Sequence, residues 1–527
     1  MPAYPASYQP LDAKALQPIA SMANGNVMGI PFIPGWQIIK AITDSSSGIQ
    51  ALLVTNSLPS NPDQTYAVLA MGQLWTGILA NYFSGQVNNF ALSTLRATLG
   101  GPPAGAPPPP NAALFCDAFQ VQYTKYAEPA IFNILNQASF ATQVAGLPLI
   151  VIGQGLGAPL AQLAAMAFRQ LRSGIPANLH TAACYTFSTP PMGDSNFATL
   201  FTQTIPAAFN VSAAGVDFFA NPPQPFPGAL AAGIPQALPA AIPTLSILNN
   251  QAVDDPWRER SGAYYTQLLG GATPVATTPG NVPAPPPGYN GDLAESLTQL
   301  IAVAYQQTQH PGSQPSPIPA YSLDSFITSL TPSGTRWGAI FLDSANKRIL
   351  VVFRGELCFE ESVSALTQIG SVYPAYLPDG CALAPGLDQI YAAVRDGLRT
   401  NVVSALSKVG GTNIVMAGHS IGGALANIAA LDFATQAAGI TAPVAIYTFG
   451  APPSGDPGFQ SAFASTFTGS QISSFQLSRN GDPFPGLPAV SGGPMTVGAA
   501  LNLTGGTPYD DNINHSLTSY IVLLKVN

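Results

Sequence analysis

The chain has 527 residues, of which 47% are hydrophobic and only 8% are charged, so it can bury the cores of two domains beneath an uncharged surface. Its formal net charge of −8 argues against a nucleic-acid-binding protein, which needs a basic surface. None of its four cysteines is spaced as CxxC, so a zinc site or a redox dithiol has little support.

The first residues, MPAYPASYQPLDAKALQPIA, lack the basic start and apolar core of a secretory signal. The uncharged surface nevertheless favours an extracellular protein, with the cytoplasm as the alternative. The stretch from Gly146 to Phe168 carries no charge for long enough to imitate a membrane span. Its glycines and Pro159 fit a strand, a turn and a helix better. We therefore expect a protein that does not cross the membrane.

The first half of the chain contains strand-like runs and two low-complexity segments. Residues 100–111, GGPPAGAPPPPN, and the Ala/Pro-rich residues 205–243 are expected to be loops or insertions. Proline and glycine are dense again in residues 272–291, which we interpret as a linker because such a composition makes a poor core. The predicted domains are residues 1–271 and 292–527.

Three segments recur in the same order in the two halves. GQGLGAPLAQLAAMAF from Gly153 aligns without gaps with GHSIGGALANIAALDF from Gly418. CYTFSTPPMGDSNF from Cys184 aligns with IYTFGAPPSGDPGF from Ile446, and TYAVLAMGQL resembles RILVVFRGEL. Such self-similarity predicts a tandem duplication. Short runs such as ILVVF and NIVMA alternate with helical stretches, so each half is predicted to be an α/β domain with a mostly parallel sheet flanked by helices.

The stretch GHSIG places Ser420 between two glycines. This pattern occurs by chance about as often as not in a chain so rich in Gly and Ser, so its surroundings must decide. TNIVMA precedes it as a strand, and GALANIAALDFATQAA follows it as a helix. That is the arrangement of the nucleophile elbow of α/β-hydrolases, in which glycines permit a strained turn. Ser420 is therefore the candidate nucleophile.

A serine nucleophile needs a base and an acid, and in this fold the acid and then the histidine follow it along the chain. Of the four histidines, only His515 follows Ser420 with room for an acid between them. Asp456 and Asp482 each follow a strand-like run, and we favour Asp482, in RNGDPFPGLP; a turn-capping aspartate is the alternative for it. Asp432 lies well down the helix after the serine and is expected to point away.

Residues 290–527 resemble the class 3 lipases, the fungal-lipase-like family. The resemblance rests on VVFRG, GHSIGGALA, YTFGAPPSGDPGF, DPFPGLP and the histidine before SLTSY, which stand in the family's order. It implies an α/β-hydrolase fold, and therefore two tandem domains of that kind. It also implies five functional residues: Ser420 as nucleophile, Asp482 as acid, His515 as base, and Ile421 and Glu356 as the backbone N–H donors of the oxyanion hole.

Glu356 departs from the family, which has a small hydroxyl residue or sometimes aspartate there. A carboxylate aimed at a developing oxyanion opposes catalysis, so we expect this side chain to turn away or to be held by a donor. The following segment, LCFEESVSALTQIGSVYPAYLPDGC, corresponds to the family's lid region; a movable cover and an ordinary amphipathic surface helix are equally compatible with it. Cys358 and Cys381 bracket the segment and could pair, whereas Cys184 is expected to be a buried free thiol.

The first half lacks the chemistry that the second half retains. Gly155 replaces the nucleophile, Gln73 replaces the residue at the oxyanion site, and Asp255 is a candidate match for the acid. At the histidine position ESLTQL, from Glu295, resembles HSLTSY, but it fits the first helix of the second domain equally well. The first half is therefore predicted to be a degenerate, pseudo-hydrolase domain that packs against the active half or shapes the substrate entrance.

The predicted function is hydrolysis of a carboxylic ester, such as an acylglycerol, through an acyl-enzyme and without a metal or organic cofactor. The expected partners are the ester or lipid substrate and, transiently, a lipid interface. A polyester depolymerase, a phospholipase and a thioesterase are alternatives on the same elbow. A non-catalytic binding or scaffold protein is a further alternative, against which the three retained triad members speak.

Overall fold

The computed structural model consists of two compact units, each built around a seven-stranded sheet. The described part of the first unit lies within residues 4–238, and that of the second within residues 285–525. The described residues are 4–24, 35–44, 47–74, 77–78, 90–137, 142–169, 179–213, 234–238, 285–309, 311, 318, 320–329, 334–366, 370–436, 440, 443–467, 473–487, 498–503 and 515–525. Most of the predicted linker lies outside these residues, so the domain limits stay predictions.

The sheet of the first unit starts with three antiparallel strands and continues with four strands parallel to the third. In sheet order these are β1 (Gln37–Asp44), β2 (Ile49–Leu58), β3 (Asn61–Gln73), β6 (Leu149–Gln154), β7 (Thr181–Phe187), β8 (Ala208–Ala213) and β9 (Ile234–Leu238). β6, with the sequence LIVIGQ, is buried at every position, as expected of a parallel strand that is covered on both faces.

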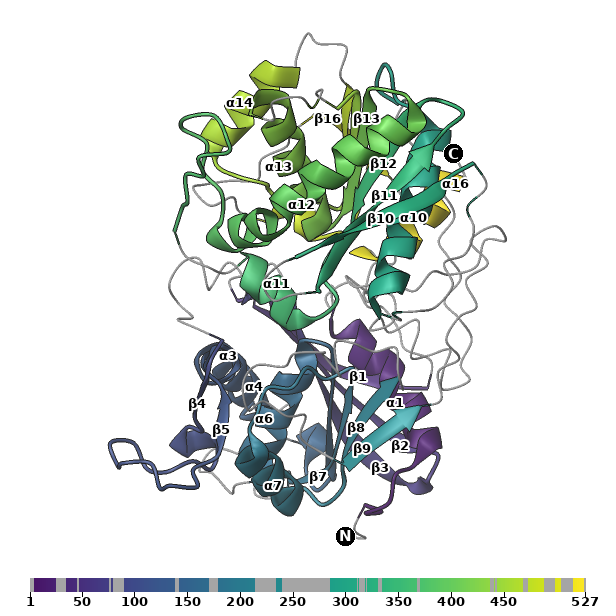
Figure 1. Cartoon of the computed structure of the whole chain (residues 1–527). Coiled ribbons are helices and arrows are strands. Elements are labelled where there is room, and N and C mark those ends of the chain that lie inside the picture. Colours follow the sequence, from purple (N-terminus) through teal and green to yellow (C-terminus); the bar gives the residue numbers. More distant parts are fainter. Residues whose placement is uncertain are drawn as a thin grey trace. The chain divides into compact units, whose positions relative to one another are not determined.

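Helices cover both faces of this sheet (Figure 1). Leu16 and Ile19 of the first helix pack with Ile150 and Ile152 of β6, whereas the alternate residue Leu149 faces the helices on the other side. The remaining elements of the unit are α1 (Pro10–Met22), η2 (Ala97–Leu99), α3 (Asp117–Gln122), η3 (Tyr123–Ala127), α4 (Glu128–Leu135), α6 (Gly157–Arg169), α7 (Ser195–Thr204) and the small sheet of β4 (Leu92–Thr94) with β5 (Leu114–Cys116).

The sheet of the second unit repeats this order and these strand directions. Its strands are β10 (Ser322–Thr328), β11 (Arg336–Asp343), β12 (Arg348–Phe353), β13 (Asn413–His419), β14 (Ala445–Phe449), β15 (Ser473–Arg479) and β16 (Ala499–Leu503). The α/β-hydrolase-like fold that the sequence predicts is therefore present in both units. The shared topology is what a duplication would produce, and the duplication itself stays a prediction.

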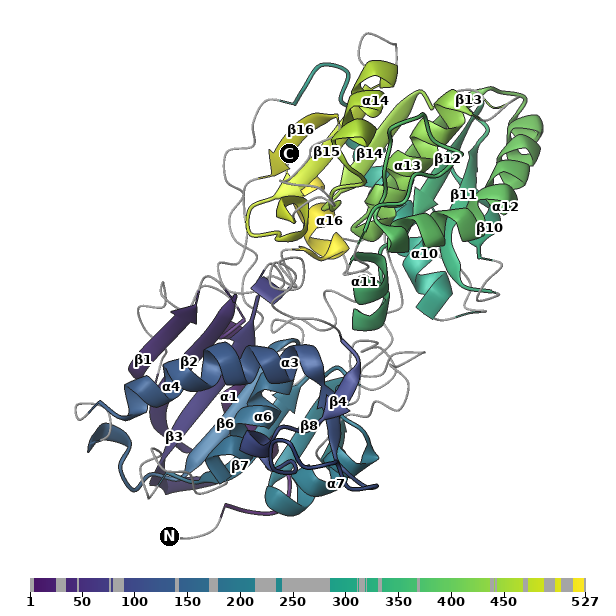
Figure 2. The same cartoon turned by 90° about the vertical axis from the view of Figure 1, so that its left-hand side faces the viewer.

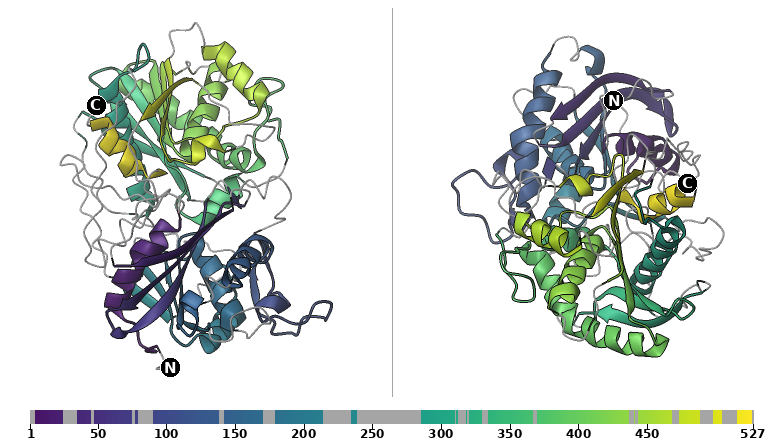
Figure 3. Two further views of the ribbon diagram at one scale, coloured as in Figure 1. Left: turned by 180° about the vertical axis from the view of Figure 1, so that it is seen from behind. Right: turned by 90° about the horizontal axis from the view of Figure 1, so that it is seen from above.

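The second unit buries its sheet between two pairs of helices (Figure 2). α10 and α16 lie side by side on one face, which the right-hand view of Figure 3 shows in teal and yellow, and α12 and α13 pack on the other. Gly410 ends α12 with a φ of 60°, as expected of the predicted stop. The helices are α10 (Gly291–Gln309), α11 (Phe359–Leu366), α12 (Pro385–Val409), α13 (Ile421–Thr435), α14 (Pro457–Phe467), η5 (Phe484–Gly486) and α16 (Leu517–Lys525).

All four cysteines are buried, and none of them forms a disulfide. The disulfide that the sequence allows between Cys358 and Cys381 is therefore not formed, whereas the prediction of a buried free thiol at Cys184 is confirmed. The uncharged stretch from Gly146 onwards forms β6, a turn and α6, and no described helix is long and apolar enough to span a membrane. The described residues also contain no group of three or more His, Cys, Asp or Glu that could hold a metal ion.

Candidate active site

Ser420 occupies a strained turn between β13 and α13. Its backbone has a φ of 55° and a ψ of −132°, a conformation that residues with a side chain rarely adopt. The flanking glycines make the turn possible. A Cβ on Gly418 would lie 2.0 Å from the carbonyl oxygen of Gly422, and a Cβ on Gly422 would lie 2.3 Å from that of Arg354. The strand, the strained turn and the helix together form a nucleophile elbow.

Three side chains from separate loops form one hydrogen-bonded chain at this turn. His515 Nε2 lies 2.7 Å from Ser420 Oγ, and His515 Nδ1 lies 2.7 Å from Asp482 Oδ1. Ser420 follows β13 and Asp482 follows β15; these strands run in the same direction, so their carboxyl ends meet at one edge of the sheet. The side chains of His515 and Asp482 are fully buried. The structure thus brings the three predicted residues within hydrogen-bonding distance.

Two aromatic residues hold the acid and the histidine in place. Tyr520 Oη donates to Asp482 Oδ2 at 2.6 Å, and the N–H of Phe484 donates to Asp482 Oδ1 at 3.0 Å. Burial, and secondly the charge of Asp482, raise the pKa of Tyr520 well above its ordinary value, so the phenol keeps the proton that it donates. The Phe484 ring stacks on the imidazole of His515 with centroids 3.9 Å apart. Neither residue was predicted from the sequence, although Phe484 lies in the DPFPGLP segment and Tyr520 in the SLTSY segment.

The other candidate aspartates of the second unit are engaged elsewhere. Asp432 accepts hydrogen bonds from Arg395 at 2.8 and 3.0 Å, so the prediction that it points away from the site is confirmed. Asp456 Oδ1 accepts from the N–H groups of Phe459 at 2.8 Å and Ala382 at 2.9 Å, which places it at the start of α14. Neither carboxylate forms a hydrogen bond with His515 among the described residues.

A second histidine, His419, helps to link four parts of the site. Its Nε2 lies 2.7 Å from the carbonyl oxygen of His515, which can only accept, so Nε2 carries the proton and Nδ1 accepts from Tyr305 Oη at 2.9 Å. Tyr305 Oη in turn accepts from the N–H of Gly355 at 2.8 Å, directly before Glu356. Tyr305 and His419 thus connect α10, the elbow, the end of β12 and the segment that carries His515. The sequence contained no signal for this connection.

Acidification is expected to destabilise the second unit partly through His419. Burial, and secondly His515, lower the pKa of His419 well below its ordinary value of 6.5, so it stays neutral in the folded protein. Below about pH 6.5 the unfolded chain binds a proton that the folded chain does not, which lowers stability by up to about 1.4 kcal/mol per pH unit. In His419→Gln this contribution is absent. Urea unfolding between about pH 5 and 7.5 should give a shallower acid slope for the variant, and equal slopes would contradict the assignment.

The side chain of Glu356 is held by a donor, which is one of the two outcomes that the sequence predicts for it. It does not turn away: Ser420 Oγ donates to Glu356 Oε2 at 2.8 Å, so the donor is the candidate nucleophile. Ile421 is the first residue of α13, whose initial N–H groups have no acceptor inside the helix. Ile421 directly follows Ser420. The residue before Glu356 lies against the same serine, because a Cβ on Gly355 would be 2.7 Å from the Cβ of Ser420. Their role as oxyanion donors stays a proposal.

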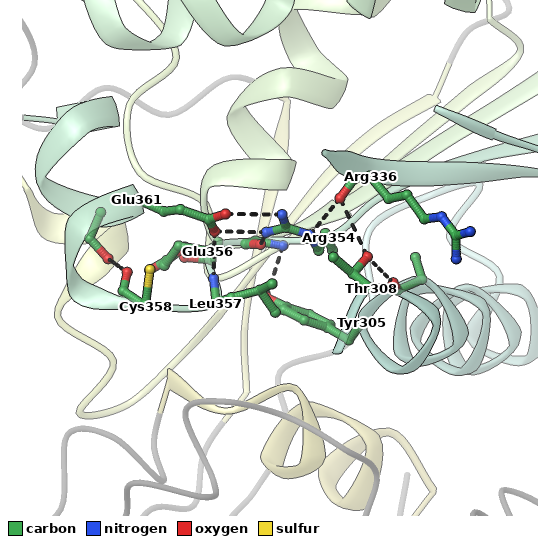
Figure 4. A network of polar contacts seen from close by, with 12 residues as sticks. Tyr305, Thr308, Arg336, Arg354, Glu356, Leu357, Cys358 and Glu361 are labelled. Carbon is green, nitrogen blue, oxygen red and sulfur yellow. Dashed lines mark hydrogen bonds and ion pairs between the residues drawn. The ribbon is translucent and has the colours of Figure 1, made fainter. Parts of the chain in front are cut away.

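A buried ion pair fastens α11 to the end of β12 (Figure 4). The fully buried guanidinium of Arg354 donates to both carboxylate oxygens of Glu361, at 2.9 and 3.1 Å, and to the carbonyl oxygen of Arg336 at 2.7 Å. The N–H of Leu357 also donates to Glu361, at 2.7 Å. Arg354 further lies over the ring of Trp337. These contacts anchor the start of the segment that corresponds to the family's lid region. The two interpretations of that segment, a movable cover and a surface helix, both stay open.

The first unit retains the backbone of the elbow. Gly155 has a φ of 53°, close to the 55° of Ser420, and its N–H donates to the carbonyl oxygen of Phe187 at 2.9 Å. Gln154 stands where the second unit has a histidine, and Gln17 of α1 donates to its side chain at 3.1 Å. The turn is therefore built and braced from the first helix of its unit in a similar way, but it presents no hydroxyl.

The structure places some of the other predicted counterparts of the site residues and leaves one undescribed. Gln73 Nε2 donates to the carbonyl oxygens of Ser47 and Leu74, at 2.8 and 3.1 Å. Asp255 lies outside the described residues. Glu295 belongs to α10, so of the two interpretations of its segment the first helix of the second unit is correct. His180, the histidine among the described residues of the first unit, lies just before β7, at the opposite end of the sheet from Gly155.

Restoring a hydroxyl to the first unit is expected to restore no activity. Gly155→Ser in a Ser420→Ala background would add a serine with no described imidazole beside it, and an unactivated hydroxyl is a poor nucleophile. Turnover of a short-chain aryl ester should equal that of Ser420→Ala alone. Turnover above that background, together with phosphonate labelling of the first unit, would contradict the degenerate character of this half.

Comparisons with known proteins point to one family. The family model described as lipase (class 3) matches residues 112–220 and 350–492, one region in each unit. A lipase of Rhizomucor miehei is 28% identical over 165 residues, 31% of this chain and 44% of the relative. Phospholipase A1-II 1 of Oryza sativa subsp. indica is 34% identical over 99 residues, 19% of this chain and 24% of the relative. The chain thus spans less than half the length of these relatives. A solved structure, the native Rhizomucor miehei lipase propeptide complex, is 25% identical with a TM-score of 0.36, covering 45% of this chain and 75% of that one.

Proposed function

We propose that this chain, which belongs to the class 3 lipase family, is a serine carboxylic-ester hydrolase whose active site lies in the second unit. The observation that carries the proposal is the buried hydrogen-bonded chain from Asp482 through His515 to Ser420, at 2.7 Å for each link. Its members stand in the order along the chain that an α/β-hydrolase triad requires, and their contacts are those that such roles would need. The intact chain of three groups speaks against a purely structural or scaffold role.

The proposed reaction passes through an acyl-enzyme. His515 Nε2 takes the proton of Ser420 as Oγ attacks the ester carbonyl, and the carbonyl oxygen becomes an oxyanion that the N–H groups of Ile421 and Glu356 bind. Asp482 orients His515 and stabilises the imidazolium. His515 then gives the proton to the departing alcohol, and a water activated by His515 releases the acid and regenerates Ser420.

For the substrate we propose the ester bonds of acylglycerols, because one of the related proteins is named a lipase. The second candidate is a phospholipid ester, since another relative is named a phospholipase A1. We also propose that the protein contacts a lipid interface transiently, and that the first unit supports the second by packing or by shaping the entrance. Polyester and thioester substrates remain alternatives for the same elbow.

Covalent labelling tests the nucleophile directly. A fluorophosphonate should react with the folded chain and, after digestion, map to the peptide that contains Ser420, because only an activated serine attacks it readily. Heat-denatured protein is the matched control and should remain unlabelled. Absence of label, or label on another residue, would overturn the proposed function.

Initial rates on a panel of esters separate the substrate classes. The panel would contain a short-chain aryl ester, a triacylglycerol emulsion, phosphatidylcholine vesicles, an aliphatic polyester film and an acyl thioester. Turnover of the aryl ester and of the emulsion is expected. Faster release of fatty acid from the vesicles than from the emulsion would favour the phospholipase instead.

A further inference from the structure

The carboxylate of Glu356 is buried against the nucleophile without a compensating charge. The residue is fully buried, and its Oε2 accepts the hydroxyl of Ser420 at 2.8 Å. Its second oxygen, Oε1, has no hydrogen-bond partner among the described residues. A buried carboxylate normally has its lone pairs satisfied by several donors or a cation, because desolvation of an unpaired charge is costly. This group is therefore placed for a reason other than stability.

The arginine two residues before Glu356 is committed elsewhere. Arg354, two residues before Glu356, directs its guanidinium at both oxygens of Glu361 and at backbone carbonyls (Figure 4). Leu357, the residue after Glu356, also donates its N–H to Glu361. Glu361 on α11 thus accepts the hydrogen bonds of Arg354 and of the N–H of Leu357. Glu356 accepts one from the hydroxyl of Ser420.

Proton counting shows what this arrangement implies. Ser420 has one hydroxyl proton, and two acceptors lie beside its Oγ: His515 Nε2 at 2.7 Å and Glu356 Oε2 at 2.8 Å. Both contacts are hydrogen bonds only if one further proton is present, on His515 or on Glu356. With an ionised Glu356 and a neutral His515, the two groups compete for one proton. A hydroxyl directed at Glu356 is directed away from its base.

We propose that Glu356 is a brake on the nucleophile, an inference that rests on the proposed function. Its ionised side chain competes with His515 for the hydroxyl of Ser420 and places a negative charge beside the developing oxyanion, which raises the barrier to attack. Its neutral form instead offers an O–H donor to Oγ or to the substrate's oxygen. The side chain restrains ester attack when ionised and releases it when neutralised or displaced.

The groups around Glu356 come from several elements, and none of them neutralises its negative charge through a contact that the structure shows. The elbow contributes Ser420, the loop before α16 contributes His515 with Asp482 behind it, and α11 contributes Glu361, already paired with Arg354. From α10, Tyr305 contacts the backbone of Gly355 and the imidazole of His419, which burial keeps neutral by lowering its pKa. Of these groups, Ser420 is the one whose hydrogen bond to the carboxylate the structure shows.

The test compares Glu356→Gln and Glu356→Thr with the parent chain. The readouts are kcat/KM for a short-chain aryl ester and the rate of fluorophosphonate labelling of Ser420, from about pH 5 to 9. Glutamine keeps the shape, removes the charge and can donate to Oγ, so both rates should rise about 10-fold or more at pH 8. Threonine places the small hydroxyl typical of the family at this position.

Glu295→Gln on α10 is the matched control: it removes the same charge away from the site and should leave both rates unchanged. Thermal unfolding checks that each variant is folded. If Glu356→Gln does not fold, Glu356→Thr provides the test. The proposal for Glu356 would be wrong if a folded Glu356 variant, with Ser420 still labelled, showed rates equal to or below those of the parent. Failure to label Ser420 in every form, the parent included, would instead overturn the proposed function and this proposal with it.

Discussion

Replacing Ser420 by Ala is expected to lower kcat for a short-chain aryl ester on the order of 10⁵- to 10⁶-fold, because the acyl-enzyme can no longer form. The fold should survive. The hydroxyl is small, and its removal leaves His515 bonded to Asp482 while freeing Glu356 from its donor. Steady-state kinetics and circular dichroism of the purified variant check both parts of this prediction.

The control for this change is Ser461→Ala on the exposed side of α14, where the serine hydroxyl bonds only to the carbonyl oxygen of Pro457. That variant should turn over the ester at the parent rate. Residual turnover by Ser420→Ala within about 10-fold of the parent would show that another group is the nucleophile, since the oxyanion hole and substrate binding alone do not supply that rate.

Replacing Asp482 by Asn should cost about 10⁴-fold in kcat with little change in structure. The carboxylate accepts the Nδ1 proton of His515, which leaves Nε2 free to accept from Ser420. An amide at this position can donate to Nδ1 and so favours the wrong tautomer, with the proton on Nε2. Tyr520 can still donate to the amide oxygen, so the loop should remain in place. The pH dependence of kcat and a thermal unfolding curve measure the two effects.

Asp456→Asn is the informative comparison, because Asp456 was the rival acid. Its carboxylate caps α14 by accepting from the N–H of Phe459, and it also accepts from the N–H of Ala382. An asparagine oxygen can accept the same two hydrogen bonds. We expect normal turnover and a loss of stability below about 1 kcal/mol. A loss of activity in Asp456→Asn comparable to that in Asp482→Asn would mean that the acid has been assigned to the wrong residue.

Local sequence predicts the elements of this protein well, because their signals act over short distances. The run NIVMA, the glycines at 418 and 422 and the apolar helix after them specify a strand, a tight turn and a helix, and the structure has them in that order. The order of Ser420, Asp482 and His515 along the chain was likewise sufficient to select three residues that the structure then brings together. Gly410 ended its helix for a local reason too, since glycine adopts a left-handed φ there without strain.

The direction of side chains is not local information. The charge of Glu356 predicts that its side chain turns away or is held by a donor, but not which donor that is. The structure provides the Ser420 hydroxyl, because Arg354 and the N–H of Leu357 already donate to Glu361. Cysteine spacing likewise allowed a disulfide between Cys358 and Cys381 that packing does not make.

The amino-acid sequence by itself thus determined the fold class of each half, the elbow, and the identity of the candidate nucleophile, base and acid. Only the tertiary structure decided which groups surround them: Tyr520 behind Asp482, the link from Tyr305 through His419, and the carboxylate of Glu356 on Ser420. The physical reason is distance along the chain. Strand, turn and helix preferences are set by neighbours a few residues apart, whereas these contacts join residues 38, 114 and 64 positions apart, and only the packed sheet brings them together.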